Sequence, residues 1–128
     1  MTLAIKELKK RLNSNPDFSS SSKFFDGIVL LEIDSWVIWM KIFMGRVIVA
    51  TEEPFPFGYT FALRGPAEGW RIALDTRKNR LRETLYNRML RVEGNILEYN
   101  RVGKAVHGLT EVLREMVSEG LITIEEKK

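Results

Sequence analysis

The stretch RMLRVEGNILEYNRVGKAVHGL, Arg88–Leu109, is the most informative about the fold because it joins a strand to helices within a few residues. Alternation of apolar and polar residues over 89–93 predicts a strand, and Gly94-Asn95, a pair that tolerates positive φ, ends it. A short helix is expected around 96–100, and a longer one over 104–118 has one apolar stripe. The stripe consists of Val106, Leu109, Leu113, Met116 and Val117. A strand followed at once by an amphipathic helix indicates a sheet covered by helices.

Strand signals dominate the sequence upstream. The segments 24–33, 35–44 and 46–52 are rich in β-branched and aromatic residues and are separated by turn signals, which predicts an antiparallel meander. A fourth strand is expected over 59–64, and Gly65-Pro66 ends it and starts a helix. Strands early and helices late predict the α+β class, with a five-stranded, mainly antiparallel sheet whose one face is covered by helices.

The remaining segments complete a single domain over residues 1–128, with its core at about 24–118. Residues 3–12 have the apolar spacing of a helix, and the serine-rich segment 13–23 is interpreted as a surface connection. A basic second helix is expected over 76–89, after the one that Pro66 starts.

Composition favours a soluble, cytoplasmic globular protein. The chain is 45% hydrophobic with a net charge of +3, and it contains no cysteine, so disulfides and thiolate chemistry are excluded. The longest apolar-rich stretch, 28–50, is interrupted by charged residues and is not expected to span a membrane.

Catalytic signatures are missing from the sequence. His107 is the only histidine, so a zinc site or a nucleophile–base pair lacks partners, and no G-x-S-x-G occurs. Gly103-Lys104-Ala105 lacks the spacing of a phosphate loop. We therefore expect a protein that is not an enzyme and that needs no metal or cofactor.

The second strand is apolar on both sides, which raises the question of what covers the outer face of the sheet. Alternation assigns these residues to the helix side: Trp36, Ile38, Met40, Val47, Val49, Phe61, Leu63, Leu90 and Val92. The outer side keeps Ile28, Leu30, Trp39, Phe43 and Ile48. An exposed patch of this kind predicts a homodimer through the outer face, or a cover formed by the N-terminal helix or the serine-rich segment.

The order of elements, with GRVIVATEEPFPFGYTFALRGPAEGWRIAL and MLRVEGNILEYNRVGKAVHGLTEVLREM, resembles the sterol carrier protein type 2 family of non-specific lipid-transfer proteins over about residues 25–117. The resemblance implies binding, without chemistry, of a fatty acid, acyl-CoA, phospholipid or sterol- or isoprenoid-like lipid in a tunnel between sheet and helices. It places these residues along the tunnel: Trp36, Ile38, Met40, Phe61, Leu63, Trp70, Leu90, Ile96, Val106, Leu109, Leu113 and Met116. The final helix is the expected lid.

A filled core is the alternative, since apolar stripes usually form close-packed interiors. The protein is then a homodimeric interaction module or an accessory subunit with the same fold.

The basic run holds Arg77, Lys78, Arg80 and Arg82. It is open to three interpretations: contact with anionic lipid headgroups during transient docking on a membrane, contact with nucleic-acid phosphates, or a solvated helix face. Nucleic-acid binding is the least favoured, because the aromatic residues lie in strands and not among these cations.

Overall fold

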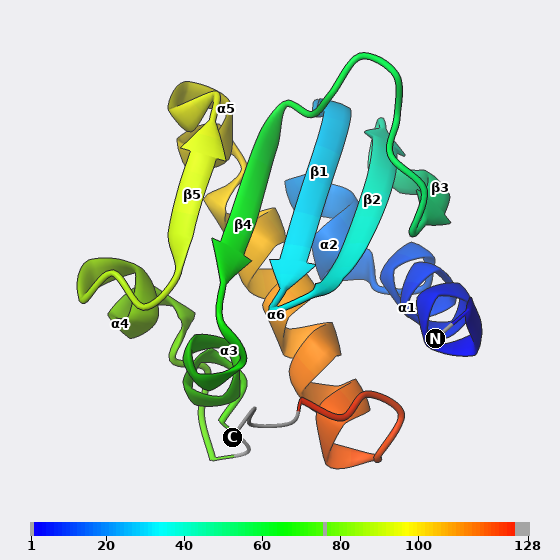
Figure 1. The fold of residues 1–128 in the computed structure, drawn as a ribbon. Coiled ribbons are helices and arrows are strands. Elements are labelled where there is room, and N and C mark those ends of the chain that lie inside the picture. The colour runs from blue at the N-terminus through cyan, green and yellow to red at the C-terminus, as the bar shows by residue number, and fades with distance from the viewer. Residues whose placement is uncertain (1, 76, 125–128) are drawn as a thin grey trace.

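One sheet organises the molecule. The computed structural model describes residues 2–75 and 77–124, and within them the strand order is β3-β2-β1-β4-β5 (Figure 1). The strands are β1 (Asp26–Ile33), β2 (Trp36–Phe43), β3 (Arg46–Thr51), β4 (Phe61–Gly65) and β5 (Arg91–Gly94). The predicted antiparallel meander of β1, β2 and β3 is confirmed. β4 instead lies parallel to β1, with Val29 opposite Phe61, and β5 is antiparallel to β4.

The helices cover one face of this sheet. They are α1 (Thr2–Asn13), α2 (Pro16–Ser21), α3 (Ala67–Ala73), α4 (Leu81–Tyr86), α5 (Ile96–Arg101) and α6 (Gly103–Ser118). In Figure 1, α2 and α6 lie behind the sheet and α1 lies at the lower right near β3, while α5 and α4 stand at opposite ends of β5. The predicted α+β class is confirmed: a mixed, mostly antiparallel five-stranded sheet with helices on it.

Two close approaches fix the path around β5, which begins at Arg91, two residues later than predicted. Leu90 is buried just before the strand, and a Cβ on Gly65 would lie only 2.2 Å from its Cδ2. Gly94 has a φ of 103°, and a Cβ there would lie 2.6 Å from the carbonyl oxygen of Thr60. Both positions therefore require glycine.

A β-bulge corrects the assignment of β3. The pairing with β2 shifts between Lys41, opposite Val49, and Ile42, opposite Val47. The extra residue reverses the alternation, so Val47 is buried against the helices, while Val49 is 41% exposed and does not face them.

The serine-rich segment is not merely a surface connection, because it contains α2. Asn15 is the N-cap, its Oδ1 accepting from the amide of Phe18 at 3.1 Å, and Pro16 occupies the first turn. Phe18 is 2% exposed, and the Ser19 hydroxyl donates to the Gly45 carbonyl at 3.1 Å. The N-cap stabilises α2 itself, and the bond from Ser19 fixes it to the turn between β2 and β3.

The helix expected over 76–89 is shorter than predicted. Position 76 lies outside the described residues, residues 77–80 are not helical, and only α4 forms. The Asp75 carboxylate accepts from the Arg77 amide at 2.8 Å, and the Asn79 side chain accepts from the Leu81 amide at 3.0 Å. These local bonds replace the first helical turn.

The centre of the outer sheet face is covered by the connection between β3 and β4, residues 52–60. Trp39 packs against Phe55, with ring centroids 5.8 Å apart, and against Tyr59 at 6.1 Å. Leu30 beneath them is 3% exposed. The cover is thus formed by neither the N-terminal helix nor the serine-rich segment.

Candidate functional site

An apolar space lies between the sheet and the two helices α2 and α6. Its lining residues are Phe18, Ser22, Phe25, Val29, Ile42, Phe61, Val102, Ala105, Val106 and Leu109. The volume of this apolar void is about 10 Å³. That is room for about one water molecule, far less than the 300 Å³ or more of typical small-molecule pockets.

Local sequence explains why the void lies here. Ala105 has a small side chain and Gly108 has none, so another helix can approach the first half of α6 closely. A Cβ on Gly108 would lie 3.8 Å from the Cβ of Phe18. The short helix α2 thus lies directly on α6 and closes the space from above. Ser22 is the polar residue of the lining, and its hydroxyl donates to the Phe18 carbonyl at 2.7 Å. Its hydrogen bond is therefore satisfied within α2.

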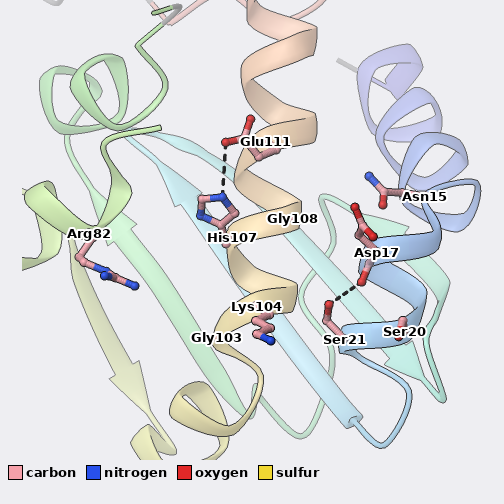
Figure 2. Close-up of a pocket in the computed structure, with 10 residues that line it drawn as sticks. All are labelled: Asn15, Asp17, Ser20, Ser21, Arg82, Gly103, Lys104, His107, Gly108 and Glu111. Carbon is pink, nitrogen blue, oxygen red and sulfur yellow. Dashed lines mark hydrogen bonds and ion pairs between the residues drawn. The ribbon is translucent and has the colours of Figure 1, made fainter. Parts of the chain in front are cut away.

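A polar groove runs along the outer side of the same two helices (Figure 2). It has a volume of about 860 Å³ and is lined by Asn15, Asp17, Ser20, Ser21, Arg82, Gly103, Lys104, His107, Gly108 and Glu111. His107 is exposed, with its Nε2 3.5 Å from the Glu111 carboxylate and its Nδ1 3.4 Å from the Asn79 side chain. Mixed charges line this groove, and α2 and α6 separate it from the apolar void.

Most residues that the resemblance placed in a tunnel are buried between sheet and helices. The buried ones are Ile38, Met40, Phe61, Leu63, Trp70, Leu90, Val106, Leu109, Leu113 and Met116. Of these, Phe61, Val106 and Leu109 line the void. Trp36 is half-buried, and Ile96 is 46% exposed on α5, so the structure does not bring it to the interior.

Sequence reasoning missed most of the lining. Phe18 is hard to find because the N-P pair before it, which caps α2, is also typical of a loop. Val102 and Ala105 lie at the join between α5 and α6, where two helices follow one another without a breaker other than Gly103. The apolar spacing of Val102, Val106 and Leu109 was a signal that could have found them.

The basic run does not form one helix face. Arg77 pairs with Asp75 at 3.0 Å, and Arg80 lies near both Asp75 and Glu83. Lys78 is exposed before α4, and Arg82 lines the polar groove. Hydrogen bonds from Arg77 hold the pKa of the Asp75 carboxyl well below its usual range.

The interior side of the site carries few ionisable groups. Tyr99 on α5 packs edge-on against Phe61, with ring centroids 5.5 Å apart, and burial raises the pKa of its hydroxyl. Across 2–75 and 77–124, no group of three or more His, Asp or Glu side chains is arranged to hold a metal ion. None of the helices described there has the length and apolarity needed to cross a membrane.

Together, the parallel β1–β4 pair and the helices packed over one side of a mixed sheet define an α+β domain with its apolar interior between the two layers. This is the fold of sterol carrier protein 2. A crystal structure of sterol carrier protein 2 matches with a TM-score of 0.73 and 17% identity, over 88% of this chain and 95% of that chain.

Two further solved structures share the fold. A conserved hypothetical protein from Thermus thermophilus, described as possibly a sterol carrier protein, matches with a TM-score of 0.71 and 16% identity, over 90% of this chain and 87% of its own. A ubiquinone synthesis protein, UbiJ-SCP2, matches with a TM-score of 0.59 and 16% identity, over 90% of this chain and 93% of its own. No protein-family model matches the chain, and no curated protein matches its sequence. The resemblance seen in the sequence is confirmed at the level of the fold.

Proposed function

We propose that this protein binds, and carries, a hydrophobic ligand between the sheet and the helices α2 and α6, without covalent chemistry. The observation that supports this most directly is the apolar void, whose lining is apolar apart from the internally bonded Ser22. The likeness in fold to sterol carrier protein 2 supports the same function. The ligand classes are those with an aliphatic or isoprenoid body: fatty acid, acyl-CoA, phospholipid or sterol-like lipid.

Binding requires that the void expand. Its cover is α2, a helix of six residues, whereas the floor is the hydrogen-bonded sheet. Displacing α2 from α6 is therefore the least costly way to open the space. Burying a sixteen-carbon chain gains on the order of 10 kcal/mol before association and ordering costs, which leaves room for both the opening and useful affinity.

The tunnel residues deeper in the core keep their proposed role as the wall of an expanded space. Ile38, Met40, Leu63, Leu113 and Met116 are continuous with the void in the same buried core. Methionine side chains repack readily, so Met40 and Met116 suit a wall that must change shape with the ligand.

The experiment compares binding of a fluorescent fatty acid, below its micelle concentration, by wild-type protein and by Ala105→Leu. Ala105 lines the void, and the three added carbons of leucine exceed its volume, so we expect binding to fall at least about tenfold at a stability cost of about 1–3 kcal/mol. Ala4→Leu is the matched control, because Ala4 is also a buried helical alanine but does not line the void. Its binding should equal that of the wild type. No bound lipid in the native mass spectrum and no uptake by the wild type would contradict the proposal.

A second function is an interaction or accessory module with a filled core, favoured by the small volume of the void, about 10 Å³. One protein with this fold is described as a ubiquinone synthesis protein. In this case the homodimer proposed for the outer face uses Phe43 and Ile48, which are 45% and 46% exposed beside the covered centre. Light scattering should give a dimer for the wild type and a monomer for Ile48→Lys; a wild-type monomer excludes the homodimer.

A further inference from the structure

Exposed apolar side chains gather at one end of the sheet, where β1 begins and β2 ends. We name this set the apolar rim: Phe24, Met44, Ile96 and Leu97, with exposures of 78%, 62%, 46% and 82%. The segments that carry them are joined by hydrogen bonds around Phe24. The Arg101 guanidinium of α5 donates to the Phe24 carbonyl at 3.4 Å, and the Met44 amide donates to the Phe25 carbonyl at 3.1 Å.

The apolar rim lies next to the apolar void. Phe25, which follows Phe24, and Val102, which follows Arg101, both line the void. Figure 1 places α5 and the beginning of β1 at the same end of the molecule, and Figure 2 shows Lys104 at the beginning of α6 beside Ser21 of α2. The rim therefore adjoins the space between α2, α6 and the sheet.

Cations surround the rim. Lys23, Arg46 and Lys104 are exposed, and among the described residues none of them takes part in an ion pair. The Lys23 ammonium lies 5.5 Å from the centroid of the Phe24 ring.

Two of the acidic side chains close by are paired: Asp26 lies 3.1 Å from Lys41, and Glu98 lies 2.6 Å from Arg101. Asp17, which lines the polar groove together with Lys104, is exposed and takes part in no ion pair among the described residues. Three unpaired cations against one unpaired carboxylate leave a positive balance around the rim, which complements an anionic surface.

We propose that the apolar rim docks on an anionic lipid bilayer, with Phe24 and Leu97 inserted among the acyl chains and Lys23, Arg46 and Lys104 at the headgroups. Apolar insertion and attraction to anionic lipids act together in such interfacial binding. This places the inserted side chains at the end of β5 opposite to α4, while Arg82 of the basic run lines the same polar groove as Lys104. This inference rests on the proposed function in one respect: it treats the rim as the entrance to the void.

The first test exploits the lack of cysteine in the chain. Leu97→Cys and Tyr86→Cys each accept one environment-sensitive fluorophore at an exposed position. Tyr86, 90% exposed on α4 at the other end of β5, is the matched control. With phosphatidylcholine vesicles that contain phosphatidylserine, we expect a blue shift and quenching by bilayer-embedded quenchers at position 97 only. An equal response at position 86, or no response at position 97, overturns the proposal.

The second test measures partitioning of the unlabelled chain of residues 1–128 into the same vesicles. Phe24→Ser combined with Leu97→Ser should lower the partition coefficient at least about tenfold, equivalent to about 1.4 kcal/mol, while Tyr86→Ser leaves it unchanged. Partitioning that depends on salt alone and is insensitive to the double substitution overturns insertion. Uptake of a monomeric fluorescent fatty acid from water should persist in the double variant. Docking without any uptake by the wild type therefore refutes the carrier function and leaves this inference standing.

Discussion

The two halves of α6 face interiors of different kinds. In the first half, Ala105, Val106 and Leu109 border the apolar void under the short helix α2. In the second half, Leu113 and Met116 are 1% and 0% exposed within the core cluster that also contains Trp70. One helix therefore has a first half bordering a residual space and a second half in the filled core.

Polar contacts reinforce the difference. Near the end of α6, Glu119 accepts two hydrogen bonds from Arg11 of α1, at 2.7 and 2.8 Å, and the Arg114 guanidinium donates to the Asp75 carbonyl at 2.8 Å. The beginning of α6 has Val102 at its N-cap, with no side-chain capping bond. We expect opening movements to start at the first half and the second half to act as an anchor.

The largest loss of stability is expected when a side chain is removed from the filled core around the second half of α6. Trp70 is 0% exposed, and its indole Nε1 donates to the Glu32 carbonyl at 2.8 Å. Trp70→Ala leaves a large cavity and removes the hydrogen bond to the Glu32 carbonyl, so the free energy of unfolding should fall by about 4 kcal/mol. Urea denaturation measures this. A loss below about 1 kcal/mol would mean that the second half is not the anchor.

Shortening Phe18 of α2, the helix that covers the void, should affect both stability and binding. Phe18 is 2% exposed and lines the void, so Phe18→Ala enlarges the void while costing about 3 kcal/mol of stability. We expect tighter binding of the fluorescent fatty acid below its micelle concentration, because less of the space has to be opened. Trp70→Ala is the control, since its cavity does not adjoin α2; equal gains in affinity for both variants would contradict a site confined to the first half.

The sequence predicted the filled core around the second half of α6 better than the surroundings of its first half. Alternation in β1 and β4, and the stripe residues Leu113 and Met116 on α6, were enough to assign this part of the core. These patterns depend on burial, which periodicity reports directly.

The surroundings of the first half of α6 were not predicted, because they depend on local contacts. The N-cap at Asn15 made a helix of a serine-rich segment, and the bulge at Ile48 reversed the facing of Val49.

The parallel pairing of β4 with β1 and the placement of residues 52–60 over Trp39 are tertiary features with no local signature. Neither could be derived from spacing.

Removing the N-cap of α2 should test the role of this helix in opening the void, with a smaller loss of stability. Asn15→Ala removes the hydrogen bond to the Phe18 amide and should destabilise the protein by about 1 kcal/mol. Asn95→Ala is the matched control, because Asn95 caps α5 by the same bond to the Glu98 amide at 3.0 Å. Stopped-flow binding should show faster ligand uptake for Asn15→Ala alone. The same acceleration in both variants would indicate general loosening instead of a gate at α2.

The smallest effect concerns the anchor at the end of α6 and its dependence on pH. The hydrogen bonds from Arg11 hold the pKa of the Glu119 carboxyl below its ordinary value of 4.5. A carboxyl whose pKa is lowered by folding stabilises the protein above the ordinary value, and this contribution is lost as the pH falls through the lowered one. The melting temperature of Glu119→Gln should therefore lie slightly below that of the wild type at pH 7, and the difference should shrink as the pH falls below about 4.5.

Calorimetry across this range measures the difference, which is small because the pair is exposed to solvent. Glu115→Gln is the matched control, since that carboxylate lies 3.5 Å from the same guanidinium and is 65% exposed. It should change the melting temperature at pH 7 less than Glu119→Gln does. A difference between wild type and Glu119→Gln that stays constant down to about pH 3 would show that Arg11 anchors α6 through packing of its side chain and not through the ion pair. In that case the end of α6 is held to α1 by apolar contacts of the Arg11 stem, beside the hydrogen bond from Arg114 to the Asp75 carbonyl.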